Sequence, residues 1–342
     1  MSRADRKSRA QSKRALPKYA DVCAAAERLT GYAVSTPLLE SPWLNERMGA
    51  RLLIKAEPLQ RTGSFKFRGA FNCISQIDPA ERLNGVVAYS SGNHAQAVAA
   101  AAHLHDIPAT IVMPGNAPEV KVTGTKRYGA DIVRYDRARE NREEMAERIA
   151  EEKGATLVRP YEEFNVIAGQ GTVGLEIAAA CRVRRIAPDY VVVPAGGGGL
   201  MAGCALAISA EMPEAALYTA EPEGYDDHAR SFIAGARQEV MDMSATSLCD
   251  ALLSNTPGEL TFAINRRRVR GGVTADDGAV LRAMATAFHH LKLVIEPGGA
   301  AALAAVLNGE LDIEGKTVVV VASGGNVDAD VFRLALEAGE DA

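Results

Sequence analysis

The sequence is poor in aromatic residues, which make up 5% of its 342 residues and include a single Trp. It has five cysteines, an odd number, and no two of them form a C-x-x-C pair. This spacing excludes a zinc knuckle, gives no sign of a disulfide framework and is typical of a cytoplasmic protein. No run approaches the roughly 18 uninterrupted apolar residues of a membrane-spanning helix, so we expect no membrane partner.

The N-terminus is basic and polar, and it lacks the apolar run of a signal peptide. We expect residues 1–18 to form a mobile basic tail; an arm that binds nucleic acid is the alternative. Over the whole chain, 38 Lys and Arg residues stand against 43 Asp and Glu residues, which gives a net charge of −5 with His neutral. Because this balance is ordinary, we expect a small-molecule ligand and no nucleic-acid partner.

Short apolar runs rich in β-formers alternate with helix-like segments, the pattern of an α/β fold with parallel sheets. The expected strands are residues 51–55, 86–90, 109–113, 131–135, 156–158, 190–194, 217–221 and 317–322. The expected helices include residues 94–105, 137–152, 199–211 and 276–292, the last with a core-facing stripe at Val280, Met284, Ala287 and Leu291. The length favours about two domains of 100–200 residues each. Residues 86–158 suffice for a four-stranded unit, but the pattern leaves open which lobe takes the preceding segment.

Many of the 31 glycines lie in turns, and the clearest turn follows the Val-Val-Val run of residues 191–193. It holds four consecutive glycines and an apolar residue that opens a helix-like segment: Gly196, Gly197, Gly198, Gly199 and Leu200. Glycine lets backbone N–H groups crowd around an anion, and a helix N-terminus adds partial positive charge. The loop suits a phosphate, although it is neither a Walker loop nor a G-x-G-x-x-G fingerprint. A flexible turn is the alternative.

Two further polar turns follow expected strands. Ser90, Ser91 and Asn93 lie in the turn that joins the strand at residues 86–90 to the next helix, and their hydroxyl and amide groups suit a substrate carboxylate. An ordinary helix cap explains the same residues equally well. The second turn, Ser-Gly-Gly-Asn at residues 323–326, ends the last strand. All three turns can converge on one cleft.

Lys66 lies between Phe65 and Phe67, near the expected start of a helix. Desolvation by the two rings and a nearby helix N-terminus would both lower the pKa of its amine. A neutral lysine is a nucleophile that can form a Schiff base, whereas a solvated lysine on an amphipathic helix is the ordinary alternative. A phosphate loop together with such an amine indicates pyridoxal 5′-phosphate (PLP).

The run from Glu57 to Ala70, EPLQRTGSFKFRGA, resembles the cofactor-lysine segment of the serine/threonine dehydratase and serine racemase family. Residues 90–96, 166–172, 196–200 and 323–326 resemble the same family in the same order, so that the likeness covers roughly residues 19–335. It implies a fold-type II PLP enzyme with the tryptophan synthase β-like α/β fold, in which parallel sheets are flanked by helices. Residues 19–78 and 165–342 would form a large PLP-binding domain, and residues 79–164 a small α/β domain. The family also implies a homodimer.

The resemblance assigns roles to individual residues. Lys66 would hold PLP as a Schiff base and remove the substrate Cα proton, Asn93 would bind the phenolic oxygen, and Ser323 would face the pyridine nitrogen. The other cofactor-binding positions would be Phe65, Gly196, Gly197, Gly198, Gly199, Leu200 and Glu296. The substrate carboxylate would be held by Ser90, Ser91, Asn93 and His94.

A serine hydroxyl at position 323 cannot keep the pyridine nitrogen protonated, which favours quick expulsion of a β-leaving group. We therefore expect an ammonia-lyase that converts L-threonine or L-serine to a 2-keto acid and ammonia. A 3-hydroxyaspartate dehydratase is one alternative, because Arg142 aligns with an arginine that would reach a second carboxylate. A serine racemase is another, because Ser91 would act as acid and base on the cofactor face opposite Lys66. A cysteine synthase-like β-replacement enzyme fits less well, because its substrate loop differs.

Residues 221–227 resemble the divalent-cation site of the racemase-like subgroup. The carboxylates of Glu221 and Asp227 and the carbonyl of Tyr225 would offer hard oxygen ligands for Mg²⁺ or Ca²⁺. A solvated acidic turn is the alternative. Ala251 departs from the family pattern, which has Gly there, and this leaves the shape of the substrate pocket open.

Overall fold

The structure is a computed structural model that describes residues 15–90, 92–117, 119–137, 139–242 and 244–339. Ser91 and residues 1–14 of the expected basic tail therefore lie outside the described residues.

The larger sheet has six strands in the order β1-β2-β10-β7-β8-β9. Only β1, which pairs with β2, is antiparallel. The strands are Leu38–Glu40 (β1), Arg51–Ala56 (β2), Thr317–Ala322 (β10), Tyr190–Pro194 (β7), Ala216–Pro222 (β8) and Val269–Ala275 (β9). The central strand β10 reads TVVVVA and is buried over its last five residues, as expected of a parallel strand covered on both faces.

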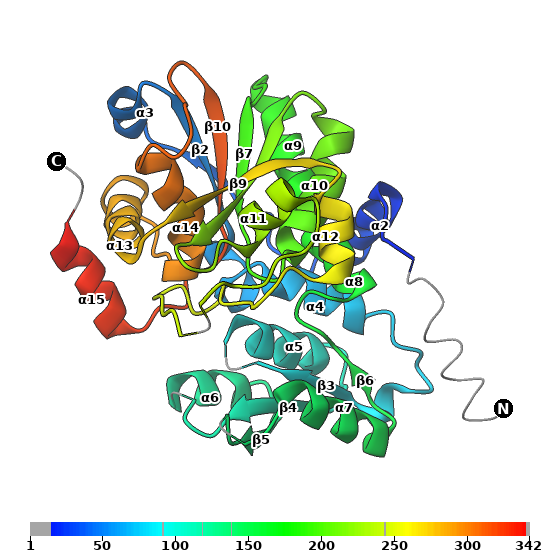
Figure 1. Ribbon diagram of the computed structural model, residues 1–342. Coiled ribbons are helices and arrows are strands. Elements are labelled where there is room, and N and C mark those ends of the chain that lie inside the picture. Colours follow the sequence, from blue (N-terminus) through cyan, green and yellow to red (C-terminus); the bar gives the residue numbers. More distant parts are fainter. Residues whose placement is uncertain (1–14, 91, 118, 138, 243, 340–342) are drawn as a thin grey trace.

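The smaller sheet has four parallel strands in the order β5-β4-β3-β6. They are Asp131–Tyr135 (β5), Ala109–Pro114 (β4), Val86–Tyr89 (β3) and Thr156–Leu157 (β6). All four lie within the expected small domain, and Figure 1 shows them as a separate layer below the larger sheet. The domain boundaries near residues 79 and 165 stay a prediction.

Helices cover both sheets (Figure 1). The α-helices are Tyr19–Leu29 (α2), Pro42–Met48 (α3), Lys66–Ile74 (α4), Asn93–His103 (α5), Glu119–Lys126 (α6), Arg142–Lys153 (α7), Phe164–Gln170 (α8), Thr172–Arg184 (α9), Gly199–Glu211 (α10), Asp227–Ala234 (α11), Glu259–Asn265 (α12), Asp277–Thr286 (α13), Pro297–Leu307 (α14) and Ala329–Ala338 (α15). Short 3₁₀ segments are Glu57–Leu59 (η1), Arg61–Gly63 (η2) and Arg82–Asn84 (η3), and a π-helix, Ala287–Leu291 (η4), follows α13.

All eight expected strands are confirmed to within one residue at each end. The expected helix at 137–152 begins only at Arg142, because the Asn141 side chain caps the helix by accepting from backbone N–H groups of its first turn. Strands β1 and β9 were not expected. β9 contains Gly271 and Gly272, which resemble a loop in sequence, but Gly272 lies so close to Thr219 and Ala229 that a side chain would not fit.

The helical segment Phe164–Arg184, formed by α8 and α9, is long and apolar enough to cross a membrane by length and composition alone. In its most apolar stretch, 67% of the residues are buried inside the protein. Packing against α4 and α10 accounts for this burial, as in the core helix of a folded domain.

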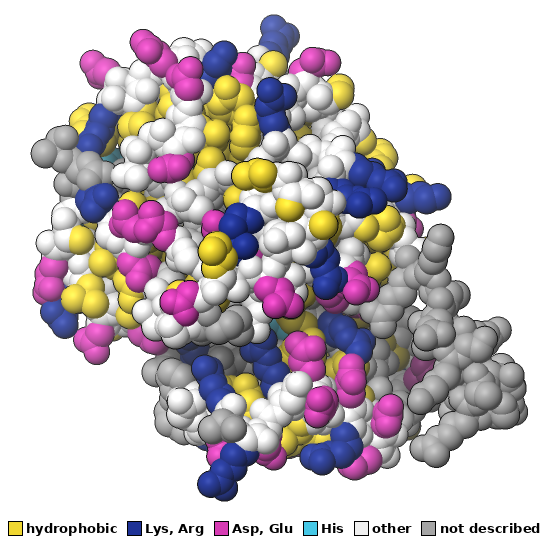
Figure 2. Space-filling model, viewed as in Figure 1, with side chains coloured by type: hydrophobic (Ala, Val, Ile, Leu, Met, Phe, Trp, Pro, Cys, Tyr) yellow, Lys and Arg dark blue, Asp and Glu magenta, His cyan; other side chains and the backbone are white. Residues whose placement is uncertain are grey.

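On the face shown in Figure 2, Lys and Arg side chains are interspersed with Asp and Glu rather than gathered in one patch. The carboxyl ends of β3, β7 and β10 are followed by the three polar or Gly-rich turns singled out from the sequence. Ligand sites of open α/β sheets lie at such strand ends, so the topology points to this region.

Candidate active site

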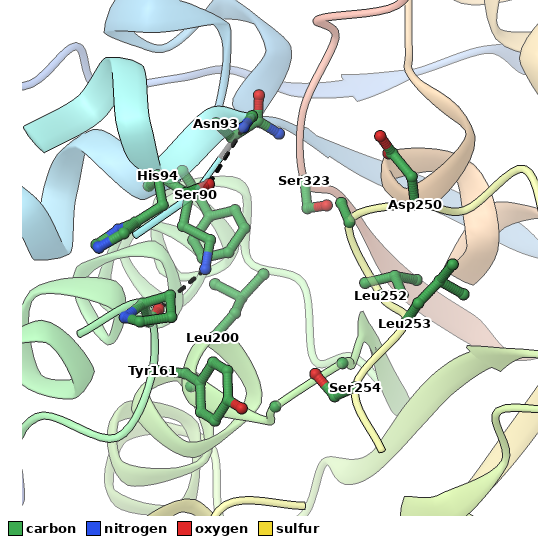
Figure 3. Close-up of a pocket in the computed structure, with 18 of the residues that line it drawn as sticks. Ser90, Asn93, His94, Tyr161, Leu200, Asp250, Leu252, Leu253, Ser254 and Ser323 are labelled. Carbon is green, nitrogen blue, oxygen red and sulfur yellow. Dashed lines mark hydrogen bonds between the residues drawn. The ribbon is translucent and has the colours of Figure 1, made fainter. Parts of the chain in front are cut away.

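A single pocket brings the three turns together, between the smaller sheet and the larger one (Figure 3). It contains every expected cofactor and substrate position that the structure describes: Phe65, Lys66, Ser90, Asn93, His94, Arg142, Gly196, Gly197, Gly198, Gly199, Leu200, Glu296 and Ser323. Ser91, which lies outside the described residues, is next to Ser90 in the chain. In Figure 3, Ser90, Asn93 and His94 lie on one side, and Asp250, Leu252 and Leu253 lie opposite.

Lys66 is the first residue of α4, and its side chain extends into the pocket. Its Nζ atom donates to the Pro160 carbonyl oxygen at 2.9 Å and lies 5.1 Å from the centroid of the Phe65 ring. Burial lowers the pKa of the Lys66 amine to about 8, although the nearby Glu296 carboxylate opposes this effect. Phe67, expected to contribute, does not line the pocket; its ring packs against Phe71 in the core.

The glycine loop is built to present N–H groups. Side chains behind it hold its carbonyl oxygens: His228 Nε2 donates to Gly196 at 2.8 Å, and Thr261 Oγ1 donates to Gly197 at 2.7 Å. Gly198 has a φ of +86°, a conformation that favours glycine, and it precedes α10. In the described part of the chain, the N–H groups of the loop have no protein acceptor. They and the N-terminus of α10 therefore form an anion site that fits the phosphate of PLP.

Tyr161 covers this loop from the pocket side, and the sequence did not single it out. A Cβ atom placed on Gly197 would lie 2.4 Å from atoms of the Tyr161 ring, and one on Gly199 would lie 2.9 Å from its Cβ. The absence of side chains at both glycines is thus a packing requirement. The only sequence signal for Tyr161 is its position just after the expected strand 156–158, at the same strand end as the other site residues.

A chain of polar groups lies beside Ser323, itself 5% exposed. Asn326 Nδ2 donates to Asn93 Oδ1 at 2.7 Å, and Asn93 Nδ2 donates to Glu296 Oε1 at 2.5 Å. Burial raises the pKa of Glu296 to about 8, although the Asn93 hydrogen bond opposes this effect. The Ser323 hydroxyl, together with the Asn93 amide, gives this part of the pocket uncharged hydrogen-bonding groups.

The ring of His94 is hydrogen-bonded to the protein backbone and uncharged, so it does not offer a cation to the substrate. Its Nε2 atom lies 2.9 Å from the Val158 carbonyl oxygen and donates to it, and burial lowers the pKa of the ring to about 3. His94 can therefore hold a substrate carboxylate only through its backbone N–H, in the first turn of α5.

Arg142 is the first residue of α7, directly after the capping residue Asn141. It lines the pocket, with its guanidinium carbon 5.8 Å from the centroid of the Tyr89 ring. Within the described residues, no carboxylate forms an ion pair with it. The pocket therefore offers a cation that can take a second carboxylate of a ligand.

The pocket wall opposite Ser90 is a segment of residues 250–254, from which the sequence singled out only Ala251. Asp250 forms an ion pair with Lys121 of α6 at 3.0 Å, which joins this wall to the unit of the smaller sheet. Ala251 packs beside Gly298: a Cβ atom placed on Gly298 would lie 3.2 Å from the Ala251 methyl group. The extra methyl is therefore accommodated by a glycine at the start of α14.

The residues expected to bind a metal lie outside this pocket, where β8 leads into α11. Glu221 is fully buried and accepts from the N–H groups of His228 and Ala229, whereas Asp227 Oδ2 has no hydrogen-bond partner in the described part of the chain. Burial and the nearby Asp227 raise the pKa of Glu221, and burial raises that of Asp227 to about 7. Among the described residues there is no group of three or more His, Cys, Asp or Glu side chains that could hold a metal ion.

Comparison with known proteins identifies the fold and the cofactor. The family described as "Pyridoxal-phosphate dependent enzyme" matches residues 29–324. The chain belongs to this family. Within it, the L-threo-3-hydroxyaspartate ammonia-lyase of Pseudomonas sp. is 44% identical over 94% of this chain and 99% of its own length.

Two solved structures have the same fold as this chain. The serine racemase of maize superposes with a TM-score of 0.86 at 37% identity, covering 94% of this chain and 98% of its own. The threonine deaminase of T.th. superposes with a TM-score of 0.83 at 41% identity, covering 91% of this chain and 99% of its own. The expected fold-type II PLP fold and the resemblance to serine/threonine dehydratases and serine racemases are thus confirmed, and the relatives support a PLP-dependent ammonia-lyase.

Proposed function

We propose that this PLP enzyme dehydrates a dicarboxylic β-hydroxy amino acid, with 3-hydroxyaspartate as its preferred substrate, and that hydrolysis of the dehydrated product gives a 2-keto acid and ammonia. The observation that carries the proposal is the Arg142 guanidinium, which lines the pocket and has no acidic partner within the described residues. Its fork of donors matches a second carboxylate, which L-serine and L-threonine, our first expectation, do not have. Relatives named L-threo-3-hydroxyaspartate ammonia-lyase and beta-hydroxyaspartate dehydratase, 44% and 39% identical, agree with this choice.

The pocket fits PLP on its own geometry. The N–H groups of the glycine loop suit the phosphate, and the Lys66 amine in the pocket suits covalent attachment. Asn93 and Ser323 offer hydrogen bonds to the ring substituents, and Phe65 lies beside Lys66. When bound, PLP draws electrons from the substrate Cα and makes its proton acidic.

The chain's own residues then have distinct tasks. The N–H groups at the start of α5, with Ser90 and Asn93, hold the α-carboxylate at a helix N-terminus. Arg142 holds the second carboxylate, so the substrate is fixed at both ends. Lys66 Nζ takes the Cα proton; because burial lowers the pKa of this amine to about 8, much of it is neutral near that pH. Loss of the β-hydroxyl as water then leaves a product that hydrolyses to a 2-keto acid and ammonia.

The test is keto-acid release from L-serine, L-threonine, D-serine and both diastereomers of 3-hydroxyaspartate. We expect the highest kcat/KM with a 3-hydroxyaspartate isomer. Arg142→Ala should lower the ratio of kcat/KM for that isomer to kcat/KM for L-serine by about 10- to 100-fold, the range of a lost charge-assisted hydrogen bond of about 1.5–3 kcal/mol. Lys66→Ala should abolish release from every substrate. An unchanged ratio in Arg142→Ala would exclude Arg142 as the site of the second carboxylate. A higher kcat/KM with L-serine or L-threonine than with either 3-hydroxyaspartate isomer would exclude the dicarboxylic substrate, and no release from any compound would exclude the lyase.

Racemisation is a second candidate, carried by the sequence Ser90-Ser91-Gly92-Asn93. A hydroxyl at Ser91 would give and take a proton at Cα from the side opposite Lys66. The serine racemase of Oryza sativa subsp. indica, 42% identical, agrees with this candidate. We expect Ser91→Ala to remove D-serine formation while keto-acid release persists; equal D-serine formation by both proteins would exclude the role.

We further propose that Glu221, Asp227 and the Tyr225 carbonyl bind Mg²⁺ or Ca²⁺. Glu221 and Asp227 are both buried, and in the described part of the chain no basic side chain is bonded to either carboxyl group. Such a pair is unfavourable unless a proton or a cation lies between the two groups. The unpartnered Asp227 Oδ2 atom is the free oxygen that a hard cation prefers.

A further inference from the structure

We propose that Tyr89 is a positioning residue that holds the Arg142 guanidinium over its ring, and so sets the preference for a dicarboxylic substrate. This inference rests on the proposed function, because it concerns how that function's second-carboxylate site is built. It adds a residue to which the sequence assigned no role.

The first support is the geometry of the pair. The guanidinium carbon of Arg142 lies 5.8 Å from the Tyr89 ring centroid, within the range of about 6 Å in which a cation is attracted to an aromatic face. Both residues line the pocket. Tyr89 is only 6% exposed, so its ring is held by the surrounding protein. Arg142 is exposed, and its side chain lies over that ring at the edge of the pocket.

The second support is what fixes the ring. Tyr89 ends strand β3, which is hydrogen-bonded to β4 on one side and to β6 on the other. Its side chain packs in a core cluster with Val112 of β4 and with Met145 and Ala146 of α7. Because α7 also carries Arg142, the helix that presents the cation and the ring that receives it are packed as one body.

The third support is electrostatic. Arg142 is the first residue of α7, where the helix dipole disfavours a cation. Its guanidinium therefore needs another favourable contact, and the Tyr89 ring provides one. The charged side chains that act on Tyr89 are Glu143, Arg159 and Arg142 itself, and burial raises the pKa of the Tyr89 hydroxyl, so the ring stays neutral. A neutral aromatic face orients the guanidinium without occupying its N–H donors, which an acidic partner would occupy. The arrangement leaves those donors for a ligand.

The experiment measures, for the holoenzyme and each variant, kcat/KM for 3-hydroxyaspartate relative to L-serine. A second readout is inhibition by succinate, which has the four-carbon dicarboxylate chain of that substrate, relative to butyrate. In Tyr89→Leu we expect the kcat/KM ratio to fall and the relative inhibition constant for succinate to rise by about two- to fivefold, equivalent to about 0.5–1 kcal/mol. Tyr89→Phe, which keeps the aromatic face, should retain both ratios. In an Arg142→Ala background, Tyr89→Leu should have no further effect.

Tyr135→Leu is the matched control, because Tyr135 is a buried residue of the same core cluster but does not line the pocket. It should leave both ratios at the wild-type value. An effect of Tyr89→Leu that equals that of Tyr135→Leu, or that persists without Arg142, would overturn the positioning role. If Arg142→Ala changes the ratios and Tyr89→Leu does not, this inference alone fails. If Arg142→Ala changes neither ratio, the second-carboxylate site of the proposed function fails with it.

Discussion

The Asn93 side-chain amide donates a hydrogen bond to a Glu296 carboxylate oxygen 2.5 Å away, joining two residues separated by 203 positions in the chain. Asn93 begins α5 beside the smaller sheet, and Glu296 is the residue before α14 in the larger unit. Because this carboxylate is buried at the junction, within electrostatic reach of Lys66, the protonation of the pocket is linked to the stability of the fold.

The first prediction concerns the pH dependence of stability. Burial raises the pKa of Glu296 from 4.5 to about 8, so between these values the folded protein holds a proton that the unfolded chain has lost. Its stabilising effect is complete below pH 4.5 and is lost as pH rises to 8, by up to about 1.4 kcal/mol per pH unit. In the PLP-free protein, the free energy of unfolding of Glu296→Gln minus that of wild type should therefore increase as the pH rises from about 5 to 8. Urea unfolding between about pH 5 and 8 measures the difference, and a constant difference would contradict the assignment.

The second prediction concerns the contact between Tyr161 and the glycine loop. Gly197→Ala places a methyl group in the space of the Tyr161 ring and should lower the free energy of unfolding by about 1–3 kcal/mol, as overpacking does. Adding Tyr161→Ala should recover part of this loss, because the ring that clashes is gone. Denaturant unfolding of the two single variants and the double variant measures the coupling. Strictly additive effects would mean that the ring does not rest on the loop.

Sequence patterns predicted those parts of the site that a local signal carries. The Val-Val-Val run ended by four glycines indicated both β7 and the phosphate loop, and a lysine between two phenylalanines indicated the amine. In contrast, the groups that hold the loop's carbonyls, His228 and Thr261, are distant in sequence and of ordinary type. Only the tertiary fold brings them behind the loop.

Phe67 and β9 show why the remaining details could not be predicted. Alternation along the chain placed both Phe65 and Phe67 beside Lys66, but the helix turns Phe67 into the core. The Gly271-Gly272 pair of β9 reads as a turn until the close approach of Ala229 is known. In both cases, contacts with distant segments decide the outcome.

The third prediction concerns the buried charges behind the lysine helix. Arg68, two residues after Lys66, forms paired hydrogen bonds with Glu57, at 2.8 Å each, and with Glu176. Burial would raise the pKa of Glu57, but the Arg68 guanidinium holds it below its usual value. Arg68→Met leaves this carboxylate without its main partner and should lower the unfolding free energy by about 3–5 kcal/mol.

Glu57→Gln combined with Arg68→Met should be less destabilised than the sum of the two single variants, because no unpaired charge remains. The control is Arg333→Met on α15, whose ion pair with Glu337 is exposed and should contribute at most about 0.5 kcal/mol. Denaturant unfolding of all four variants gives these values. A loss in Arg68→Met no larger than that in Arg333→Met would contradict the role of the network.

The last prediction concerns the cation proposed for Glu221 and Asp227. A ligand that binds the folded protein alone stabilises it by about 2.7 kcal/mol at roughly 100 times its dissociation constant, so saturating Mg²⁺ or Ca²⁺ should raise the Tm by several degrees and a chelator should reverse the rise. Glu221→Gln and Asp227→Asn should each remove the response. Glu223→Gln is the control: it makes the same change of charge at an exposed position of the same turn, and this variant should retain the rise in Tm. A Tm rise that survives in Glu221→Gln would place the cation elsewhere.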